Sequence, residues 1–282
     1  MPSDRPALRV VLVNYRCADL IERHLASGVL RPTDEVVIVD NASDPERVAA
    51  WKSRYGITPV LLGTNRGFAA GVNAAVAAST HRGLPVLLLN PDVEVTADVL
   101  ATLADALTLT SLDGVAGVGP LLRGIDGRLQ VGTAGGPLSA RSVATYFLFL
   151  SQIVPRARGL FLTRRQLARG GDVDWLCMAC LLLCPDAFDR YGPVPEDELV
   201  YGEDLAWGVT ATNQGARFVL VSEVTVVHQQ GFSGGSAAWS GALERLLHRR
   251  LGSAAAAFAV GAFRIGTTAR RALGRRIPGK TG

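Results

Sequence analysis

LRVVLVNYRCADLIERHLASGVLRPTDEVVIVDNAS, residues 8–43, decides the fold class. Its two apolar runs, 8–15 and 35–43, have the length of buried strands, and each ends in polar residues. A helix is predicted between them, from Ala18 to about Ser27. Buried strands joined by helices are typical of a parallel sheet that is covered on both faces.

The same alternation continues along the first half of the chain. Strands are predicted at 59–63 and 85–90. Helices are predicted from Pro45, from the Gly-rich turn at Asn65–Gly67 through Ser79, and from Ala97 to Leu107. We therefore expect an α/β fold with a doubly wound, mostly parallel sheet and helices on both faces.

The second half is less regular. Strands are predicted at 114–122 and 217–228, and residues 173–184 are expected to form one long apolar strand. A helix is predicted from Asp204 to Gln214. We see no internal repeat and no linker, so one domain is expected over residues 1–240, followed by a basic helical tail over 241–282.

Charge is unevenly spread along the chain. The tail from residue 241 onward carries nine Lys or Arg and a single acid, Glu244, whereas the whole chain carries only +4. The basic character therefore belongs to the tail, which favours an anionic surface. The alternative is a helix that packs on the domain and has a frayed basic end. The longest apolar stretch there, 253–263, is too short to span a bilayer.

Cysteines and the N-terminal residues indicate the compartment. Polar residues open the chain, so no secretory signal is expected and the cytosol is the default location. Cys177, Cys180 and Cys184 cluster in an apolar run, with Cys17 as the only other thiol. A zinc or iron–sulfur site needs four ligands, so buried and inert cysteines are predicted.

Polar side chains stand at the predicted carboxyl ends of four strands, where doubly wound sheets bind ligands. Any one of them could be a helix cap or a turn residue, but four neighbouring strand ends are hard to assign to packing alone. The residues are Asn14, Tyr15, Asp40, Asn41, Asn65, Arg66, Asn90 and Asp92. Neither a G-x-G-x-x-G nor a P-loop motif is present, so phosphates must be held in another way.

Two acidic segments suggest chemistry. Asp92 in LLLNPDVEV (87–95) is a hard oxygen ligand on a turn, with Glu94 close behind, and Mg²⁺ or Mn²⁺ on a pyrophosphate needs only one or two carboxylates. An ordinary Asn-Pro turn is the alternative. Glu203 and Asp204 open a helix, either as a general base or as charges that complement the helix dipole.

The order and spacing of these motifs resemble those of the family-two inverting glycosyltransferases with the GT-A fold, most closely the rhamnosyltransferase-like branch. The motifs are VVLVNY, VVIVDNAS, GTNRGFAAGVN, LLLNPDV, VDWLCMACLLL, YGEDL and VVHQQG, and the resemblance covers roughly residues 8–232. Ala206 departs from the pattern, since many relatives have an acid there. The helix after it, WGVTATNQG, lacks the arginines that are common in relatives.

The resemblance implies a role for each motif. Asp40, with Asn14 and Tyr15, is expected to hold the base and ribose of a nucleotide sugar. Asp92 takes the place of the metal-binding aspartate, with His228 completing the metal or pyrophosphate site, and Asp204 is the expected base, with Glu203 as the alternative. The nucleotide pocket is expected to include Asn41, Asn65, Arg66, Gly67, Asn73 and Asn90.

The implied activity is metal-dependent, inverting transfer of a sugar, with Mg²⁺ or Mn²⁺, to an acceptor hydroxyl. Residues 1–120 are the expected donor half and 121–240 the acceptor half. A deoxysugar donor such as dTDP-rhamnose and a lipid-linked or cell-envelope glycan are the first expectation. A tailoring enzyme for small-molecule natural products and a non-catalytic nucleotide-binding relative are the alternatives. The tail is expected to contact the inner face of the cytoplasmic membrane peripherally. Binding to nucleic acid is not expected.

Overall fold

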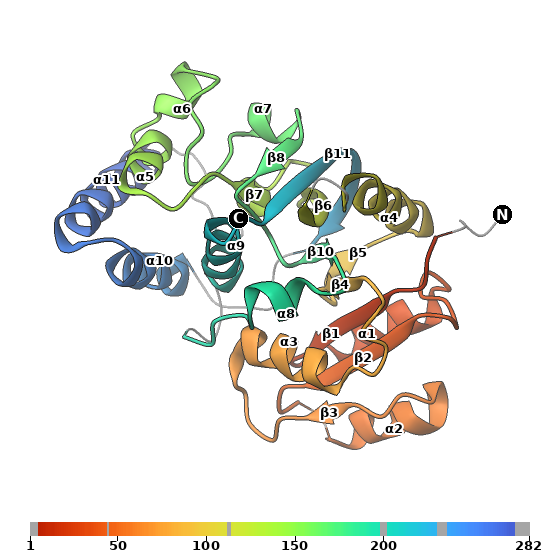
Figure 1. Cartoon of the computed structure of the whole chain (residues 1–282). Coiled ribbons are helices and arrows are strands. Elements are labelled where there is room, and N and C mark those ends of the chain that lie inside the picture. Colours follow the sequence, from red (N-terminus) through yellow and green to blue (C-terminus); the bar gives the residue numbers. More distant parts are fainter. Residues whose placement is uncertain (1–4, 44, 112–113, 198–201, 230–235, 274–282) are drawn as a thin grey trace.

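A central sheet of nine strands lies between layers of helices in the computed structural model (Figure 1), which describes residues 5–43, 45–111, 114–197, 202–229 and 236–273. Its strands follow the spatial order β3-β2-β1-β4-β10-β6-β11-β5, and β8 pairs with β11. The predicted α/β class with a mostly parallel sheet is confirmed.

The strands and helices have the following bounds. The strands are β1 (Arg9–Asn14), β2 (Glu35–Asp40), β3 (Val60–Leu61), β4 (Val86–Leu89), β5 (Val93–Glu94), β6 (Val115–Arg123), β7 (Ala134–Gly135), β8 (Gly171–Val173), β9 (Trp175–Leu176), β10 (Cys180–Leu183) and β11 (Arg217–His228). The helices are α1 (Ala18–Ala26), α2 (Pro45–Tyr55), α3 (Gly67–Ala78), α4 (Ala97–Ser111), the 3-10 turn η1 (Val131–Thr133), α5 (Ala140–Phe147), α6 (Leu150–Ile153), α7 (Arg164–Leu167), α8 (Ala187–Tyr191), α9 (Glu203–Asn213), α10 (Ser236–Arg250) and α11 (Ser253–Ala272).

Strand pairing brings the polar strand ends together. β1 is parallel to both β2 and β4, with Asn14 in register with Asp40 at the carboxyl ends. The short strand β5 follows β4 and pairs antiparallel with the end of β11, which sets Val93 opposite His228. Residues from both halves of the chain therefore lie at the same end of the strands.

The prediction of a single strand over 173–184 is wrong. The chain forms β8 and β9 and then turns at residues 177–179 before β10 enters the sheet antiparallel to β4 and β6. β9 pairs with β7 in a separate two-stranded sheet, and the Cys177 N–H donates to Thr133 O at 2.9 Å. A run of apolar residues could not reveal this break, because both pieces are buried.

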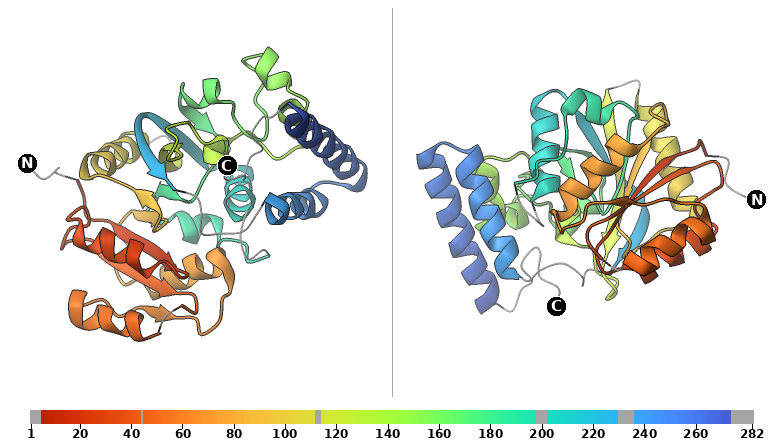
Figure 2. Two further views of the ribbon diagram at one scale, coloured as in Figure 1. Left: turned by 180° about the vertical axis from the view of Figure 1, so that it is seen from behind. Right: turned by 90° about the horizontal axis from the view of Figure 1, so that it is seen from below.

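Helices α10 and α11 pack as a hairpin beside α5, on the outer side of the molecule (Figure 2). Their inner faces share a hydrophobic cluster with the domain, in which Leu247 and Phe263 meet Phe147, Trp175 and Leu205. Arg270 of α11 is buried and donates to the Tyr146 and Phe147 carbonyls at 2.8 and 3.1 Å. These carbonyls lie in the last turn of α5, where backbone C=O groups have no i+4 partner within the helix.

Within the described residues, no helix combines the length and the apolar character that crossing a membrane requires.

Candidate functional site

Asn14 and Asp40 form a buried pair at the ends of β1 and β2. The Asn14 amide donates to Asp40 Oδ1 at 2.7 Å, and the Ser43 N–H donates to Asp40 Oδ2 at 3.1 Å. Asn14 also accepts from the Cys17 N–H at 3.2 Å, at the start of α1. These bonds fix the Asp40 carboxylate at the strand edge, as the register of β1 and β2 predicts.

A second network closes the turn between β3 and α3 onto the end of β2. Asn41 is buried, and its amide donates to Asn65 Oδ1 at 2.9 Å and to the Gly67 carbonyl at 3.1 Å. Its Oδ1 accepts from the Arg66 N–H at 2.8 Å. Gly67 has φ of +87°, a conformation that costs a glycine little. These residues shape the wall of the site rather than project from it.

The structure gives Asn73 and Arg66 a partner that the sequence did not reveal. Asn73 both donates to the Val194 carbonyl at 2.8 Å and accepts from its N–H at 2.9 Å. Glu196 then accepts from Asn73 at 2.9 Å and from Arg66 at 3.1 Å. The segment 194–196 is therefore tied to the turn at α3, and no local pattern in the sequence indicates this pairing.

Tyr15 lies just beyond β1, half-buried, with the Arg16 guanidinium 5.2 Å from its ring centroid. Arg16 has φ of +57°, which is uncommon for a residue with a side chain. The turn thus presents an aromatic ring next to the Asn14–Asp40 pair.

Asp92 and His228 face each other where β5 meets the end of β11. His228 Nε2 lies 3.4 Å from Asp92 Oδ1, and both side chains are largely buried. Gln130 fixes the imidazole: its amide donates to the His228 carbonyl at 2.8 Å, so its Oε1 faces His228 Nδ1 at 3.1 Å. With Nδ1 held in this way, the ring directs Nε2 at the Asp92 carboxylate. Gln130 lies in an irregular segment where the sequence offers no signal.

The Asn90–Asp92 turn is held from two sides. The Asn90 N–H donates to Ala179 O at 2.8 Å, and His24 Nε2 lies 3.1 Å from the Pro91 carbonyl. Burial lowers the pKa of His24, so its ring is neutral and can donate to that carbonyl. Asn90 Oδ1 is buried and accepts no hydrogen bond from the described residues. Glu94 instead points outward and accepts from Gln229 at 2.8 Å.

Cys17 links this turn to the Asn14–Asp40 pair. Burial raises the pKa of the Cys17 thiol to about 11, and the nearby charges of Asp92 and Asp40 add to the effect. Both carboxylates therefore act on one thiol, which the raised pKa keeps protonated and unreactive. Candidate residues from the separate segments 14–17, 40–41 and 90–92 thus come together in space.

Asp204 in the first turn of α9 has an unusual environment. Burial raises its pKa to about 6, while the Leu205 N–H, at 2.7 Å, and the Cys177 thiol donate to the carboxylate and oppose the shift. Burial, together with the neighbouring Asp204 charge, raises the pKa of Cys177 well above its usual value. The prediction of an inert thiol fits this pKa, but its contact with Asp204 was not foreseen.

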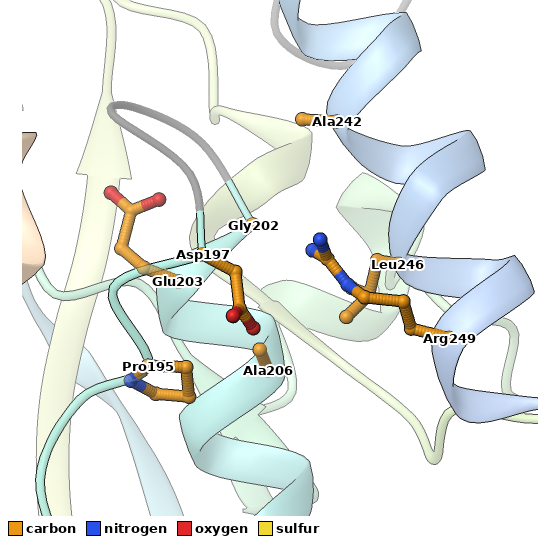
Figure 3. Close-up of a pocket in the computed structure, with 8 residues that line it drawn as sticks. All are labelled: Pro195, Asp197, Gly202, Glu203, Ala206, Ala242, Leu246 and Arg249. Atoms are coloured by element: carbon orange, nitrogen blue, oxygen red, sulfur yellow. The ribbon is translucent and has the colours of Figure 1, made fainter.

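A hollow opens between the start of α9 and helix α10 (Figure 3). Asp197 and Arg249 extend into the space between the two helices, whereas the Glu203 carboxylate turns away from α10. The residues that line the hollow are Pro195, Asp197, Gly202, Glu203, Ala206, Ala242, Leu246 and Arg249. Ala206, where an acid is common among relatives, thus forms part of a mostly apolar floor.

Comparisons with solved structures agree with this fold. S. aureus TarS (residues 1–349) is 15% identical, with a TM-score of 0.56 over 94% of this chain and 73% of that chain. GalNAc-T7, solved with UDP, GalNAc and Mn²⁺, is 15% identical, with a TM-score of 0.56 over 86% and 48% of the two chains. Glucosyl-3-phosphoglycerate synthase from Mycobacterium tuberculosis, solved with phosphoglyceric acid, is 14% identical, with a TM-score of 0.50 over 87% and 80%.

In sequence, no protein of curated function matches this chain at a significant level. The family profile described as "Glycosyl transferase family 2" matches residues 9–165, which is more than half of the chain. The matched region begins with β1 and includes the strand ends around Asp40 and Asp92. The chain therefore belongs to glycosyl transferase family 2.

Proposed function

We propose that this protein transfers a sugar from a nucleoside-diphosphate donor to an acceptor hydroxyl, with inversion at the anomeric carbon and with the help of Mg²⁺ or Mn²⁺. Asp92 and His228 are the proposed metal ligands, and Asp204 is the proposed base.

The facing pair of Asp92 and His228 carries this proposal. His228, held by Gln130, directs Nε2 toward the carboxylate oxygen of Asp92, 3.4 Å away. A carboxylate oxygen and an imidazole nitrogen are both common ligands of divalent metal ions. Ligand bonds of about 2.0–2.2 Å allow both atoms to bind one ion at such a separation. When bound, the ion supplies positive charge that stabilises the departing diphosphate.

The residues around Asp40 fit the nucleoside of the donor. The Asn14–Asp40 pair and the Asn41 network hold polar groups rigidly at the strand ends, where doubly wound sheets bind nucleotides. The Tyr15 ring offers a surface for a base, and Arg66, exposed beside Glu196, offers a positive charge for phosphate. A neighbour of the same fold was solved with UDP and Mn²⁺, in line with this donor class.

Asp204 has the properties of a general base. A hydroxyl is a poor nucleophile, so a carboxylate must accept its proton as the new bond forms. A pKa of about 6 leaves Asp204 ionised at neutral pH and a better proton acceptor than an ordinary aspartate. One base acting on one hydroxyl supports a single displacement, which inverts the anomeric carbon.

The acceptor is proposed to bind toward the hollow between α9 and α10, beside Glu203. The motif order resembles that of rhamnosyltransferases, so dTDP-rhamnose is the first donor to test, with a lipid-linked or cell-envelope glycan as acceptor. Such an acceptor is consistent with action at the inner face of the cytoplasmic membrane.

A donor screen tests the proposal. The purified chain is incubated with dTDP-, UDP- and GDP-sugars, and release of the nucleoside diphosphate is measured with EDTA, with Mg²⁺ and with Mn²⁺. We expect release with one donor class, its loss in EDTA, and recovery on addition of either ion. Asp92→Ala should lose activity by several orders of magnitude, because the metal contributes several kcal/mol to the transition state.

Glu94→Ala is the matched control, since Glu94 is an acid two residues away whose carboxylate binds Gln229 on the surface. It should keep most of the activity and the same metal dependence. Full turnover in EDTA, or equal losses in Asp92→Ala and Glu94→Ala, would reject the metal site.

A further inference from the structure

Exposed large apolar side chains concentrate on two segments of the structure. Among the described residues ten such side chains are exposed, and seven of them lie at 148–154, on α11 or at the residue that caps its C-terminal end. We call these seven the α6–α11 surface: Leu148, Leu150, Ile153, Val154, Phe258, Ile265 and Leu273. A concentration of exposed apolar side chains usually marks a surface that binds another protein or a membrane.

Arg270 joins the two segments. Besides its bonds to the end of α5, its guanidinium lies 4.3 Å from the Phe149 ring centroid. The C-terminal part of α11 therefore lies against the loop that leads into α6. Figures 1 and 2 show α11 on the outside of the molecule and α6 beyond the end of α5.

Helix α11 is apolar on two faces. Its inner face, with Ala259 and Phe263, is buried against the domain. On its outer face, Phe258 and Ile265 are 58% and 63% exposed, and Ala254, Gly261 and Ala272 continue the same stripe at intervals of three, four and seven residues. The exposed Arg264 and Arg271 border this stripe, an arrangement of apolar and basic side chains that is typical of helices lying in a membrane interface.

Charge identifies what covers this surface. Residues 139–171 contain six arginines and no acid, and no acid follows Glu244 in the chain. Arg156, Arg165 and Arg271 are exposed next to or within the two segments. Two copies of so basic a surface repel each other, whereas an anionic bilayer attracts arginines and accepts the apolar side chains between them.

We propose that the α6–α11 surface docks onto an anionic lipid bilayer, with Phe258, Ile265 and Ile153 inserted among the lipids. α11 has no membrane-spanning character, so it lies along the bilayer. The same hairpin forms one wall of the hollow, because Ala242 and Leu246 belong to α10. Docking would therefore hold that hollow near the bilayer. Only this link to a lipid-borne acceptor rests on the proposed transfer reaction.

Vesicle flotation of the full chain tests the contact, without donor or activity. Vesicles of phosphatidylcholine with phosphatidylglycerol should bind the protein, and phosphatidylcholine alone or raised salt should weaken binding. Phe258→Gln combined with Ile265→Gln should reduce binding by about tenfold or more, since each loses an inserted apolar side chain. Arg156→Glu combined with Arg165→Glu should reduce it on anionic vesicles.

Leu61→Gln combined with Leu109→Gln is the matched control, because both leucines are exposed large apolar residues outside the surface. This variant should bind as the original protein does. Three results overturn the proposal: no binding to anionic vesicles, equal loss in the control, or a dimer in solution that the Phe258 and Ile265 changes dissociate. A failed donor screen leaves the flotation result standing, so the two proposals fail independently.

Discussion

Single side chains set the protonation state of the proposed base. Asp204 is the only described acid whose pKa is raised to about 6, and burial is the main cause. The Leu205 N–H and the Cys177 thiol keep the shift from being larger. The carboxylate is therefore ionised above about pH 6 and protonated below it, which sets the pH range in which it can accept a proton.

Replacing the base tests its identity. Asp204→Asn is nearly isosteric but cannot take a proton, so transfer should fall by about 10²–10⁴-fold while donor affinity stays nearly constant. Wild-type turnover should fall about tenfold per pH unit below the pKa of Asp204. Glu203→Gln is the matched comparison. An inactive Glu203→Gln beside an active Asp204→Asn would assign the base to Glu203.

The thiol beside the base makes a second test. Cys177→Ala removes a donor to the Asp204 carboxylate, so the pKa of Asp204 should rise. The acidic limb of the pH–rate profile should then move upward by about half to one pH unit, because a neutral hydrogen bond contributes roughly 0.5–1.5 kcal/mol. Cys177→Ser keeps a donor and should stay near wild type.

Cys184→Ala provides the control for that profile, since this thiol instead donates to the Val115 carbonyl at 3.1 Å. Its acidic limb should not move. An unchanged limb in Cys177→Ala would show that the thiol does not act on the base.

Contacts between side chains were predictable only where regular structure fixes them. Asn14 and Asp40 end adjacent parallel strands, so the sequence was enough to expect them together. Gln130 beside His228 and Cys177 beside Asp204 depend on irregular segments, whose path no residue pattern specifies. Whether any of these residues has its expected chemical role stays a prediction.

Elements in the first half follow the sequence closely, because each strand and helix there carries its own apolar pattern. α1, α3 and β2 begin and end within about three residues of the expected positions, which is the usual uncertainty of element boundaries. Several short elements were not predicted, among them β5, β7, α5 and α8. β9 was missed for a different reason, since it lies inside a stretch that was predicted as one strand. It is apolar like β10 and follows β8 almost directly, so only its pairing with β7 separates it from the main sheet.

Close packing of α11 on α5 gives a prediction at this scale. A Cβ added to Gly266 would lie 2.2 Å from the Phe147 carbonyl oxygen, so Gly266→Ala must push the helices apart. We expect a loss of about 1–3 kcal/mol in the free energy of unfolding, measured by urea denaturation. Gly261→Ala meets no atom within 4 Å and should be neutral or stabilising by up to about 1 kcal/mol. Equal effects of the two changes would contradict the packing.

At the scale of the whole molecule, the question is whether the C-terminal helices α10 and α11 belong to the folded domain. The sequence suggested a basic tail after residue 240, because its charge differs so strongly from that of the preceding part. The charge count, however, reflects only the exposed side chains of these helices. Their apolar side chains Leu243, Leu247 and Val260 are buried in the cluster that includes Phe147 and Trp175. We therefore propose that α10 and α11 are an integral part of the folded domain.

Truncation tests this proposal. A chain that ends at residue 240 loses Leu243, Leu246, Leu247, Val260 and Phe263 from the core. Burial of such side chains contributes roughly 1.5–3 kcal/mol each, and their sum approaches the 5–15 kcal/mol that stabilises a typical domain. The truncated chain should therefore melt at much lower temperature and bind a hydrophobic dye through its uncovered Phe147 and Trp175. A chain that ends at residue 273 keeps both helices and loses only the last basic residues, so it should melt like the full protein. If the chain ending at 240 were as stable as the full protein, the two helices would be an appendage, as the charge pattern alone suggests.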